Sequence, residues 1–180
     1  PHQVVSLLKK DGLEGQLKII ATTGWTTDQL EVGISSAERD GSLLKSYDIV
    51  TLLIGVNNQY RGDQEIGAYK PAFEELLTKA ISLANGNVNH VIVLSIPDWG
   101  ATPFAAGRGT DKITKEINAY NDINKQVSEQ YGVNYIDITP GTREAANDNS
   151  LLASDGLHYS GKEYAIWAEK LEGIIKTILR

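Results

Sequence analysis

An acidic residue and a histidine stand three positions apart near the C-terminus, where Asp155 precedes His158 in SDGLHYSG. A carboxylate that bonds one imidazole nitrogen fixes the tautomer of the ring and favours its protonated form, so that the other nitrogen can act as a general base. Such a base has a use only when a nearby group carries the proton to be removed. The pair therefore predicts acid–base chemistry and requires a nucleophile.

Strands that alternate with helices are predicted to position this pair. A continuous apolar run without alternation is expected when helices cover both faces of a sheet. Four such runs predict strands: LKIIA (17–21), IVTLLIG (49–55), VIVLSI (91–96) and VNYIDI (133–138).

Helix signals surround these runs. A short helix through VVSLLKK ends at Gly12, and Thr26 with Gln29 forms a capping box for the next helix. The last helix has a second predicted capping box, made by Ser160 and Glu163. Apolar stripes predict the inner faces of the three longest helices. The first stripe is Tyr69, Phe73, Leu76, Leu77, Ala80 and Leu83, and the second is Ile113, Ile117, Tyr120 and Val127. The stripe of the last helix is Tyr164, Trp167, Ala168, Leu171, Ile175 and Ile178.

The alternation predicts one α/β domain over residues 1–180, a three-layer α/β/α fold with a doubly wound parallel sheet of the flavodoxin-like type. In such folds ligands bind beyond the carboxyl ends of the strands. TTGWTT (22–27) follows the first predicted strand, GVNNQYRG (55–62) follows the second, and DGLH (155–158) follows the last. We therefore expect these three stretches to meet at one edge of the sheet.

In this order and spacing the whole chain resembles the SGNH hydrolases, also called GDSL-type esterases and lipases. That family has a serine in a G-D-S stretch, a glycine, an asparagine in G-x-N-D, and D-x-x-H near the C-terminus. Gly24 matches the glycine block, Asn57 matches the asparagine block, and Asp155 with His158 matches the last block. The resemblance implies a serine ester hydrolase without a cofactor.

Two positions depart from the family pattern. Asn58 replaces the aspartate that usually closes the third block, a position that is not catalytic in the family. No G-D-S stretch occurs within residues 1–180. Six serines of the chain are considered as the nucleophile, and each lies in a predicted helix, in a predicted strand or beside the acid and the base: Ser6, Ser35, Ser36, Ser95, Ser154 and Ser160. By the family pattern we expect the nucleophile on a strand that precedes Pro1.

A physical argument also favours such a strand. In a sheet of order 2-1-3-4-5 the first strand separates the runs 17–21 and 49–55, which would otherwise stand about 9–10 Å apart. Unpaired backbone groups along that gap would each cost about 1–3 kcal/mol, against a typical stability of about 5–15 kcal/mol. Pro1 and the absence of methionine agree with this expectation. We expect about 20 or more residues upstream, a strand plus a loop.

With the serine in place, the resemblance implies a role for each matched residue. His158 takes the serine proton and returns it to the leaving alcohol, while Asp155 holds the imidazole. The backbone N–H of Gly24, the side-chain amide of Asn57 and the N–H of the serine receive the negative charge of the tetrahedral intermediate.

Two aromatic residues that follow predicted strands are candidates for contacts with the substrate. Tyr60 and Trp99 could wall the substrate pocket, or they could pack their loops. The loop 97–110 is long for an α/β connection and is the best candidate for the element that shapes the substrate site. Arg61 and Arg108 could meet a charged substrate, although solvated loop arginines are commoner.

Structural alternatives stay open for each matched residue. Asp155 could be an ordinary loop acid and His158 a buried, hydrogen-bonded histidine, while Gly24 and Asn57 could serve only as turn formers. The other two histidines, His2 and His90, have no metal-ligand spacing around them. One D-x-x-H cannot furnish a usual zinc site, so a metallohydrolase is disfavoured.

Composition excludes several other classes. The chain has 180 residues, 41% of them hydrophobic, a formal net charge of −6 and no cysteine. Disulfides and thiolate sites are therefore excluded, and a general nucleic-acid partner, which needs a basic face, is disfavoured. No apolar run approaches the length of a membrane-spanning helix.

Two functional hypotheses follow. The first is a serine ester hydrolase, an acyl or acetyl esterase or a lysophospholipase-like enzyme, with a small-molecule ester as substrate and no metal. Its candidate substrates are lysophospholipids, acyl thioesters, acetylated sugars and simple short esters, because the fold and the triad fix the reaction and not the ligand. The alternative is a non-catalytic module that binds a carbohydrate or another ligand on the same fold.

Overall fold

The computed structural model describes residues 1–62 and 65–180. Its contacts divide the chain into two compact units that alternate along the sequence. The sheet unit comprises residues 18–96 and 119–135, and the helix unit comprises residues 1–17, 97–118 and 136–180. The single domain expected over the whole chain stays a prediction.

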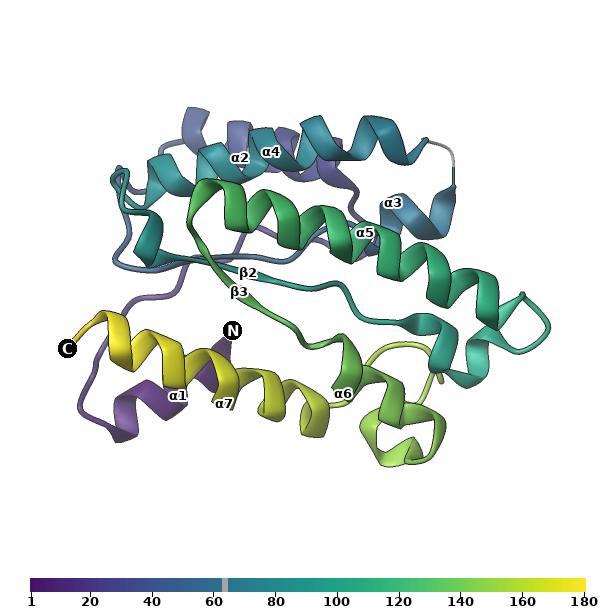
Figure 1. Ribbon diagram of the computed structural model, residues 1–180. Helices are drawn as coiled ribbons and strands as arrows, with labels where there is room; N and C mark the ends of the chain where they lie inside the picture. Colours follow the sequence, from purple (N-terminus) through teal and green to yellow (C-terminus); the bar gives the residue numbers. More distant parts are fainter. Residues whose placement is uncertain (63–64) are drawn as a thin grey trace. The chain divides into compact units, whose positions relative to one another are not determined.

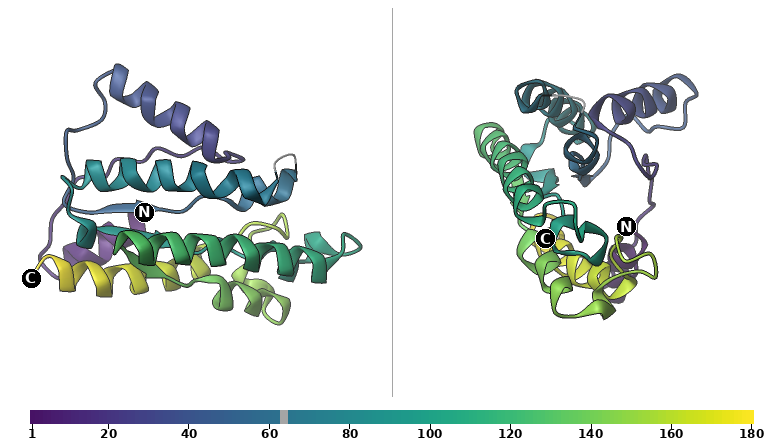
Figure 2. Two further views of the ribbon diagram at one scale, coloured as in Figure 1. Left: turned by 45° about the horizontal axis from the view of Figure 1, so that its top comes forward. Right: turned by 90° about the vertical axis from the view of Figure 1, so that its right-hand side faces the viewer.

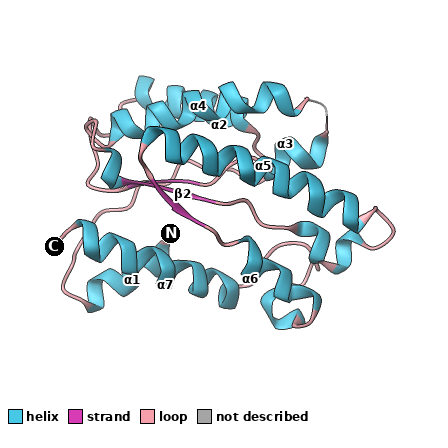
Figure 3. Cartoon of the chain, viewed as in Figure 1, coloured by secondary structure: helices cyan, strands magenta, loops and turns pink. Residues whose placement is uncertain are grey.

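The sheet unit contains a short sheet, marked in magenta in Figure 3. Its strands are shorter than the apolar runs that contain them: β1 (Val50–Leu52), β2 (Val91–Leu94) and β3 (Asn134–Ile136). The strand order is β1-β2-β3, and β1 pairs with β2 in parallel. Every residue of β2 is buried, which explains its unbroken apolar sequence.

Helices α2 (Thr27–Arg39) and α4 (Ile66–Leu83) pack side by side in the sheet unit, and α4 also packs on β1 (Figure 1). The predicted capping box of α2 is confirmed, because the Thr26 N–H donates to Gln29 Oε1 at 3.1 Å and the Thr26 side chain bonds the third helical residue. A short helix, α3 (Val56–Arg61), follows β1. Asn57 therefore lies in the first turn of α3, shortly after the end of β1.

The prediction that residues 17–21 form a strand is wrong. This segment forms no strand, and Leu17 and Ile19 are 39% and 43% exposed. A strand is stabilised by the ladder that it shares with a neighbour. Among the described residues, β1 pairs only with β2, so the apolar segment 17–21 has no ladder partner.

Helices α1 (His2–Lys10) and α7 (Gly161–Ile178) lie side by side in the helix unit, as the views in Figures 1 and 2 agree. Gln3 Nε2 donates to the Gly161 carbonyl at 3.0 Å and ties the two helices together. The helix unit also contains α6 (Thr139–Arg143) and four short 3-10 turns: Trp99–Ala101, Pro103–Ala105, Glu144–Ala146 and Asn149–Leu151. A fifth such turn, Val88–His90, precedes β2 in the sheet unit.

The predicted capping box of α7 is wrong in one half. Ser160 Oγ accepts from the Lys162 N–H at 3.2 Å, as a cap should. Glu163 does not reach back, because the Ser160 N–H already donates to the Leu151 carbonyl at 2.7 Å. Glu163 is instead buried, and its Oε1 accepts from Trp167 Nε1 at 2.7 Å. Tyr164, expected on the inner face, is exposed.

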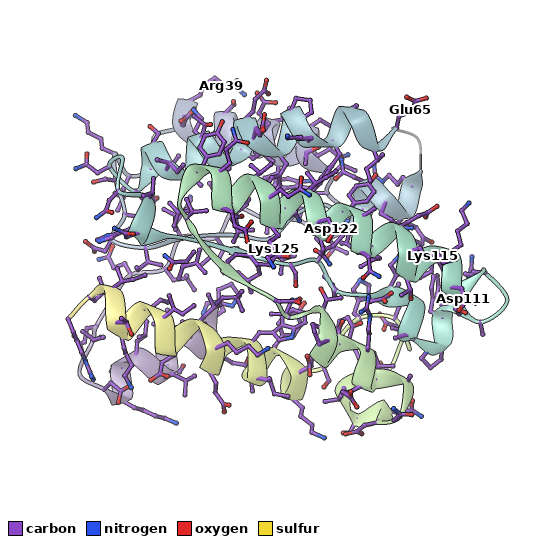
Figure 4. The ribbon with its side chains drawn as sticks, viewed as in Figure 1. Arg39, Glu65, Asp111, Lys115, Asp122 and Lys125 are labelled. Carbon is purple, nitrogen blue, oxygen red and sulfur yellow. The ribbon has the colours of Figure 1, made fainter. Side chains whose placement is uncertain are left out.

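Helix α5 (Thr110–Tyr131) follows its predicted stripe closely. Ile113, Ile117, Tyr120 and Val127 are all buried. The charged residues labelled on this helix in Figure 4 are all exposed: Asp111, Lys115, Asp122 and Lys125. The helix therefore has one apolar and one solvated face, as its 3.6-residue period requires.

Candidate active site

Asp155 and His158 are hydrogen-bonded in the helix unit. Asp155 Oδ2 lies 2.6 Å from His158 Nδ1. Asp155 Oδ1 accepts from the backbone N–H groups of Leu157 at 3.0 Å and of His158 at 2.9 Å. These bonds, above all the one to the histidine ring, lower the pKa of Asp155 to about 2. At neutral pH the carboxylate is therefore ionised and can only accept, so the imidazole donates through Nδ1.

The second imidazole nitrogen is accessible. The side chains of His158 and Asp155 are 57% and 50% exposed, and within the described residues His158 Nε2 has no hydrogen-bond partner. A side chain this exposed is not the buried histidine of the structural alternative. Nε2 is therefore open to a proton donor, as the predicted general base requires.

The turn that carries the pair is fixed by backbone hydrogen bonds. Leu152 and Tyr159 form an antiparallel bridge, and the Ala153 N–H donates to the His158 carbonyl at 2.8 Å. Gly156 closes the turn with a φ of +68°, in the left-handed region that glycine adopts without steric cost. His158 thus stands on an ordered turn just before α7.

The loop 97–110 contacts this turn. The Phe104 N–H donates to the Gly156 carbonyl at 3.2 Å. Trp99 is only 8% exposed and meets the Phe104 ring edge-on, with ring centroids 6.1 Å apart. The Arg108 guanidinium lies 4.5 Å above the Phe104 ring. The predicted shaping loop therefore borders the DGLH turn, and Trp99 packs within that loop.

Gly24 and Asn57 are brought together in the sheet unit. Asn57 Nδ2 donates to the Trp25 carbonyl at 2.9 Å, and Arg61 Nη2 donates to the Gly24 carbonyl at 2.5 Å. Gly24 has a φ of +86°. In the described part of the chain, the Gly24 N–H and the second N–H of the Asn57 amide have no partner. These are two donors of the kind that can stabilise an oxyanion.

Asn58 holds this second pair in place, a role that the sequence did not reveal. It is buried, its Oδ1 accepts from the Thr27 N–H at 3.2 Å, and its Nδ2 donates to Thr27 Oγ1 at 2.9 Å. The start of α3 is thereby tied to the start of α2. An aspartate could accept from the same N–H and from the hydroxyl, which makes Asn58 a workable replacement at this position.

Gly55 fixes the entry into α3. Its φ is +123°, and a Cβ at this position would lie 2.3 Å from the Tyr69 hydroxyl oxygen. Tyr69 Oη donates to Asn124 Oδ1 at 2.7 Å, and burial raises the pKa of this hydroxyl. Only glycine satisfies both the backbone conformation and the close approach.

The predicted site residues thus form two pairs, one in each unit. Asp155 and His158 are hydrogen-bonded to each other, and Gly24 and Asn57 belong to stretches that are bonded to each other. Tyr60 is exposed on α3, close in sequence to Asn57. The convergence of both pairs on one edge stays a prediction, as do the substrate contacts of Tyr60 and Trp99.

Neither a metal cluster nor a membrane span is found in the described residues. No group of three or more His, Cys, Asp or Glu side chains among them could hold a metal ion. None of the described helices is both long and apolar enough to cross a membrane.

Comparisons with known proteins connect the geometry to a family. The model of the GDSL-like lipase/acylhydrolase family matches residues 2–166. No match is found among curated proteins. Among solved structures, a catalytic mutant of Axe2, an acetylxylan esterase from Geobacillus stearothermophilus, is 18% identical with a TM-score of 0.74, and the match covers 97% of this chain and 79% of that one.

Two further structures have the same fold. LAE5, an alpha/beta hydrolase from the metagenome of Lake Arreo, Spain, is 16% identical with a TM-score of 0.66, over 98% of this chain and 79% of that one. A lipase/acylhydrolase from Enterococcus faecalis is 22% identical with a TM-score of 0.61, over 98% and 83%. The predicted fold class, an α/β fold of the SGNH hydrolase type with a parallel sheet, is confirmed.

Proposed function

Because the chain belongs to the GDSL-like lipase/acylhydrolase family and is a carboxylic ester hydrolase, we propose that it cleaves small acyl or acetyl esters through a Ser-His-Asp triad. The observation that carries this proposal is the 2.6 Å contact between His158 Nδ1 and Asp155 Oδ2. A histidine oriented in this way, with Nε2 exposed, has the geometry of the base in such a triad.

The proposed mechanism gives roles to atoms of His158, Gly24 and Asn57 and to the hydroxyl of the upstream serine. His158 Nε2 takes the proton of a serine hydroxyl as the serine oxygen attacks the ester carbonyl. The Gly24 N–H and the Asn57 amide stabilise the negative oxygen of the tetrahedral intermediate. His158 then gives its proton to the departing alcohol, and water repeats the sequence to release the acid and free the serine.

The nucleophile in this proposal is a serine upstream of residue 1. Two serines near the acid and the base, Ser150 and Ser160, make hydrogen bonds of their own. Ser160 Oγ donates to the Ser150 carbonyl at 2.8 Å, and Ser150 Oγ accepts from Lys162 Nζ at 2.6 Å. The family pattern also places its serine on the first strand, before the other three blocks.

Acetyl esters of sugars are the substrates that we favour over lysophospholipids. The Axe2 structures with this fold belong to an acetylxylan esterase. The loop beside the DGLH turn supports the choice, because Trp99 and Phe104 pack against each other there and Arg108 covers the Phe104 ring. Such a surface suits a small polar substrate better than a long acyl chain.

The test is a comparison of hydrolysis rates in the intact natural protein. Acetylated xylooligosaccharides, p-nitrophenyl acetate and a lysophospholipid are offered separately, with and without a serine-reactive fluorophosphonate. We expect acetyl release that the fluorophosphonate abolishes, with the label on a serine upstream of residue 1. Ligand binding without any turnover would favour the non-catalytic binding module, and a label on a serine within residues 1–180 would contradict the placement of the nucleophile.

A further inference from the structure

Asp98 is a fully buried acidic residue at the start of the loop 97–110. Its Oδ1 accepts from the Gly100 N–H at 2.9 Å. Its Oδ2 accepts from Thr114 Oγ1 at 2.9 Å and from Arg143 Nε at 2.9 Å. A buried carboxylate destabilises the fold unless it is paired and hydrogen-bonded. These bonds meet that requirement and join the loop to α5 and to α6.

The backbone of Asp98 makes two more long-range bonds. Its N–H donates to Thr142 Oγ1 at 3.1 Å, and its carbonyl accepts from the Tyr159 hydroxyl at 3.0 Å. Tyr159 is also buried, and burial raises the pKa of its hydroxyl, which therefore stays protonated and able to donate. The bond between Asp98 and Tyr159 joins residues 61 positions apart within the helix unit.

Tyr159 directly follows His158 in the chain, so the hydrogen bond that holds Tyr159 also restrains the backbone of the predicted base. The bridge between Leu152 and Tyr159 and the bond from the Ala153 N–H to the His158 carbonyl hold the backbone from one side. The Tyr159 hydroxyl holds it from the interior through Asp98. The Tyr159 ring also packs against Trp167, with centroids 5.7 Å apart.

We propose that Tyr159, held by the buried Asp98, is a positioning residue that keeps His158 in the geometry required for ester hydrolysis. This inference rests on the proposed function. A general base works only within hydrogen-bond reach of its proton. The turn whose backbone Tyr159 holds also carries both partners of the 2.6 Å contact between His158 Nδ1 and Asp155 Oδ2. Tyr159 touches no reacting atom and acts through its neighbour.

The test removes the Tyr159 hydroxyl and nothing else. Tyr159→Phe is compared with Tyr164→Phe, a matched control in the same unit: the Tyr164 ring also packs against Trp167, and within the described residues its hydroxyl has no hydrogen-bond partner. Both variants are assayed in the intact natural protein with p-nitrophenyl acetate, well below their melting temperatures. The proton resonance of the His158 Nδ1–H, which we expect far downfield because of the bond to Asp155, is followed by NMR.

We expect Tyr159→Phe to lower kcat about 10- to 100-fold with little change in KM, since misplacing a reacting group by about 1 Å costs about 100-fold. The downfield resonance should weaken or disappear in this variant, while Tyr164→Phe keeps both kcat and the resonance. Equal kcat values in the two variants, or a lower melting temperature of Tyr159→Phe with an unchanged kcat and resonance, would overturn the proposal.

A second pair of variants decides the matter if Tyr159→Phe does not fold. Thr142→Val removes the acceptor for the Asp98 N–H, whereas Thr142→Ser keeps it. We expect a lower kcat and a weaker resonance in the valine variant and recovery of both in the serine variant; equal values in the two would overturn the proposal. If the unaltered protein hydrolyses no ester, the proposed function fails, and the NMR comparison alone still tests the effect of Tyr159 on the His158–Asp155 bond.

Discussion

Replacing Asn57 by alanine separates a catalytic role from a structural one. In the described residues the Asn57 side chain makes one hydrogen bond, from Nδ2 to the Trp25 carbonyl at 2.9 Å. The loss of one such bond costs about 0.5–1.5 kcal/mol. For a protein of this length each kcal/mol lowers Tm by about 2–4 °C, so the Tm of Asn57→Ala should fall by about 1–6 °C.

The expected effect on turnover is much larger. Removing one donor from an oxyanion site typically lowers kcat by about 10²–10³-fold, which corresponds to about 2.7–4 kcal/mol. Esterase rates and thermal unfolding of the intact natural protein measure both quantities. KM should change little, because the donor stabilises the charge that develops in the transition state.

Asn58→Ala is the matched control for this prediction. Asn58 makes two bonds to Thr27, and both residues are buried. Its removal leaves the N–H and the hydroxyl of Thr27 unpaired, at about 1–3 kcal/mol for each buried group. We therefore expect Asn58→Ala to lower Tm more than Asn57→Ala does, and kcat less. The opposite ranking would refute the assignment of Asn57 to the oxyanion site.

Three further predictions follow from the geometry. Asp155→Asn should lower kcat by about 10²–10⁴-fold at nearly constant KM in the p-nitrophenyl acetate assay, because the bond that fixes the histidine tautomer is lost; an unchanged kcat would contradict it. The pKa of Asp155 is lowered from 3.8 to about 2, so its ionised form stabilises the fold above pH 3.8, and this contribution is lost as the pH falls toward 2. The stability difference between the natural protein and Asp155→Asn, measured by urea unfolding, should therefore shrink between pH 4 and pH 2.5; a difference that does not shrink in this range would refute the sign. Gly55→Ala should lower the unfolding free energy by at least about 1–3 kcal/mol, because of its positive φ and the Tyr69 hydroxyl, whereas Gly67→Ala, in open space within α4, should raise it by about 0.5–1 kcal/mol.

Local signals in the sequence predicted the longer helices, whereas the short helices α3 and α6 were not predicted. The buried stripe of α5 and the capping box at Thr26 depend on residues three or four positions apart, which one turn of helix brings together. The segment 17–21 shows the limit of such signals. Its apolar composition is that of a strand, but strand geometry depends on a partner elsewhere in the chain, and no described residue provides one.

In the candidate site, too, the sequence predicted contacts between residues close in the chain and missed those between distant ones. Asp155 and His158 could be paired from the sequence because one short turn joins them. The hydrogen bond between the Tyr159 hydroxyl and the Asp98 carbonyl could not be predicted from the sequence, because a bond across 61 positions leaves no periodic pattern. Glu163 was assigned to a capping box because it stands three residues after Ser160. In the structure its side chain instead accepts a hydrogen bond from Trp167 in the interior.

The most direct test of the central claim is a crystal structure of the intact natural protein after reaction with a fluorophosphonate. We expect the phosphonyl group on a serine, its oxygen within about 3.1 Å of both the Gly24 nitrogen and Asn57 Nδ2, and His158 Nε2 within about 3.2 Å of the serine oxygen. A phosphonylated serine that lies far from His158, or an oxygen that meets neither Gly24 nor Asn57, would contradict the account.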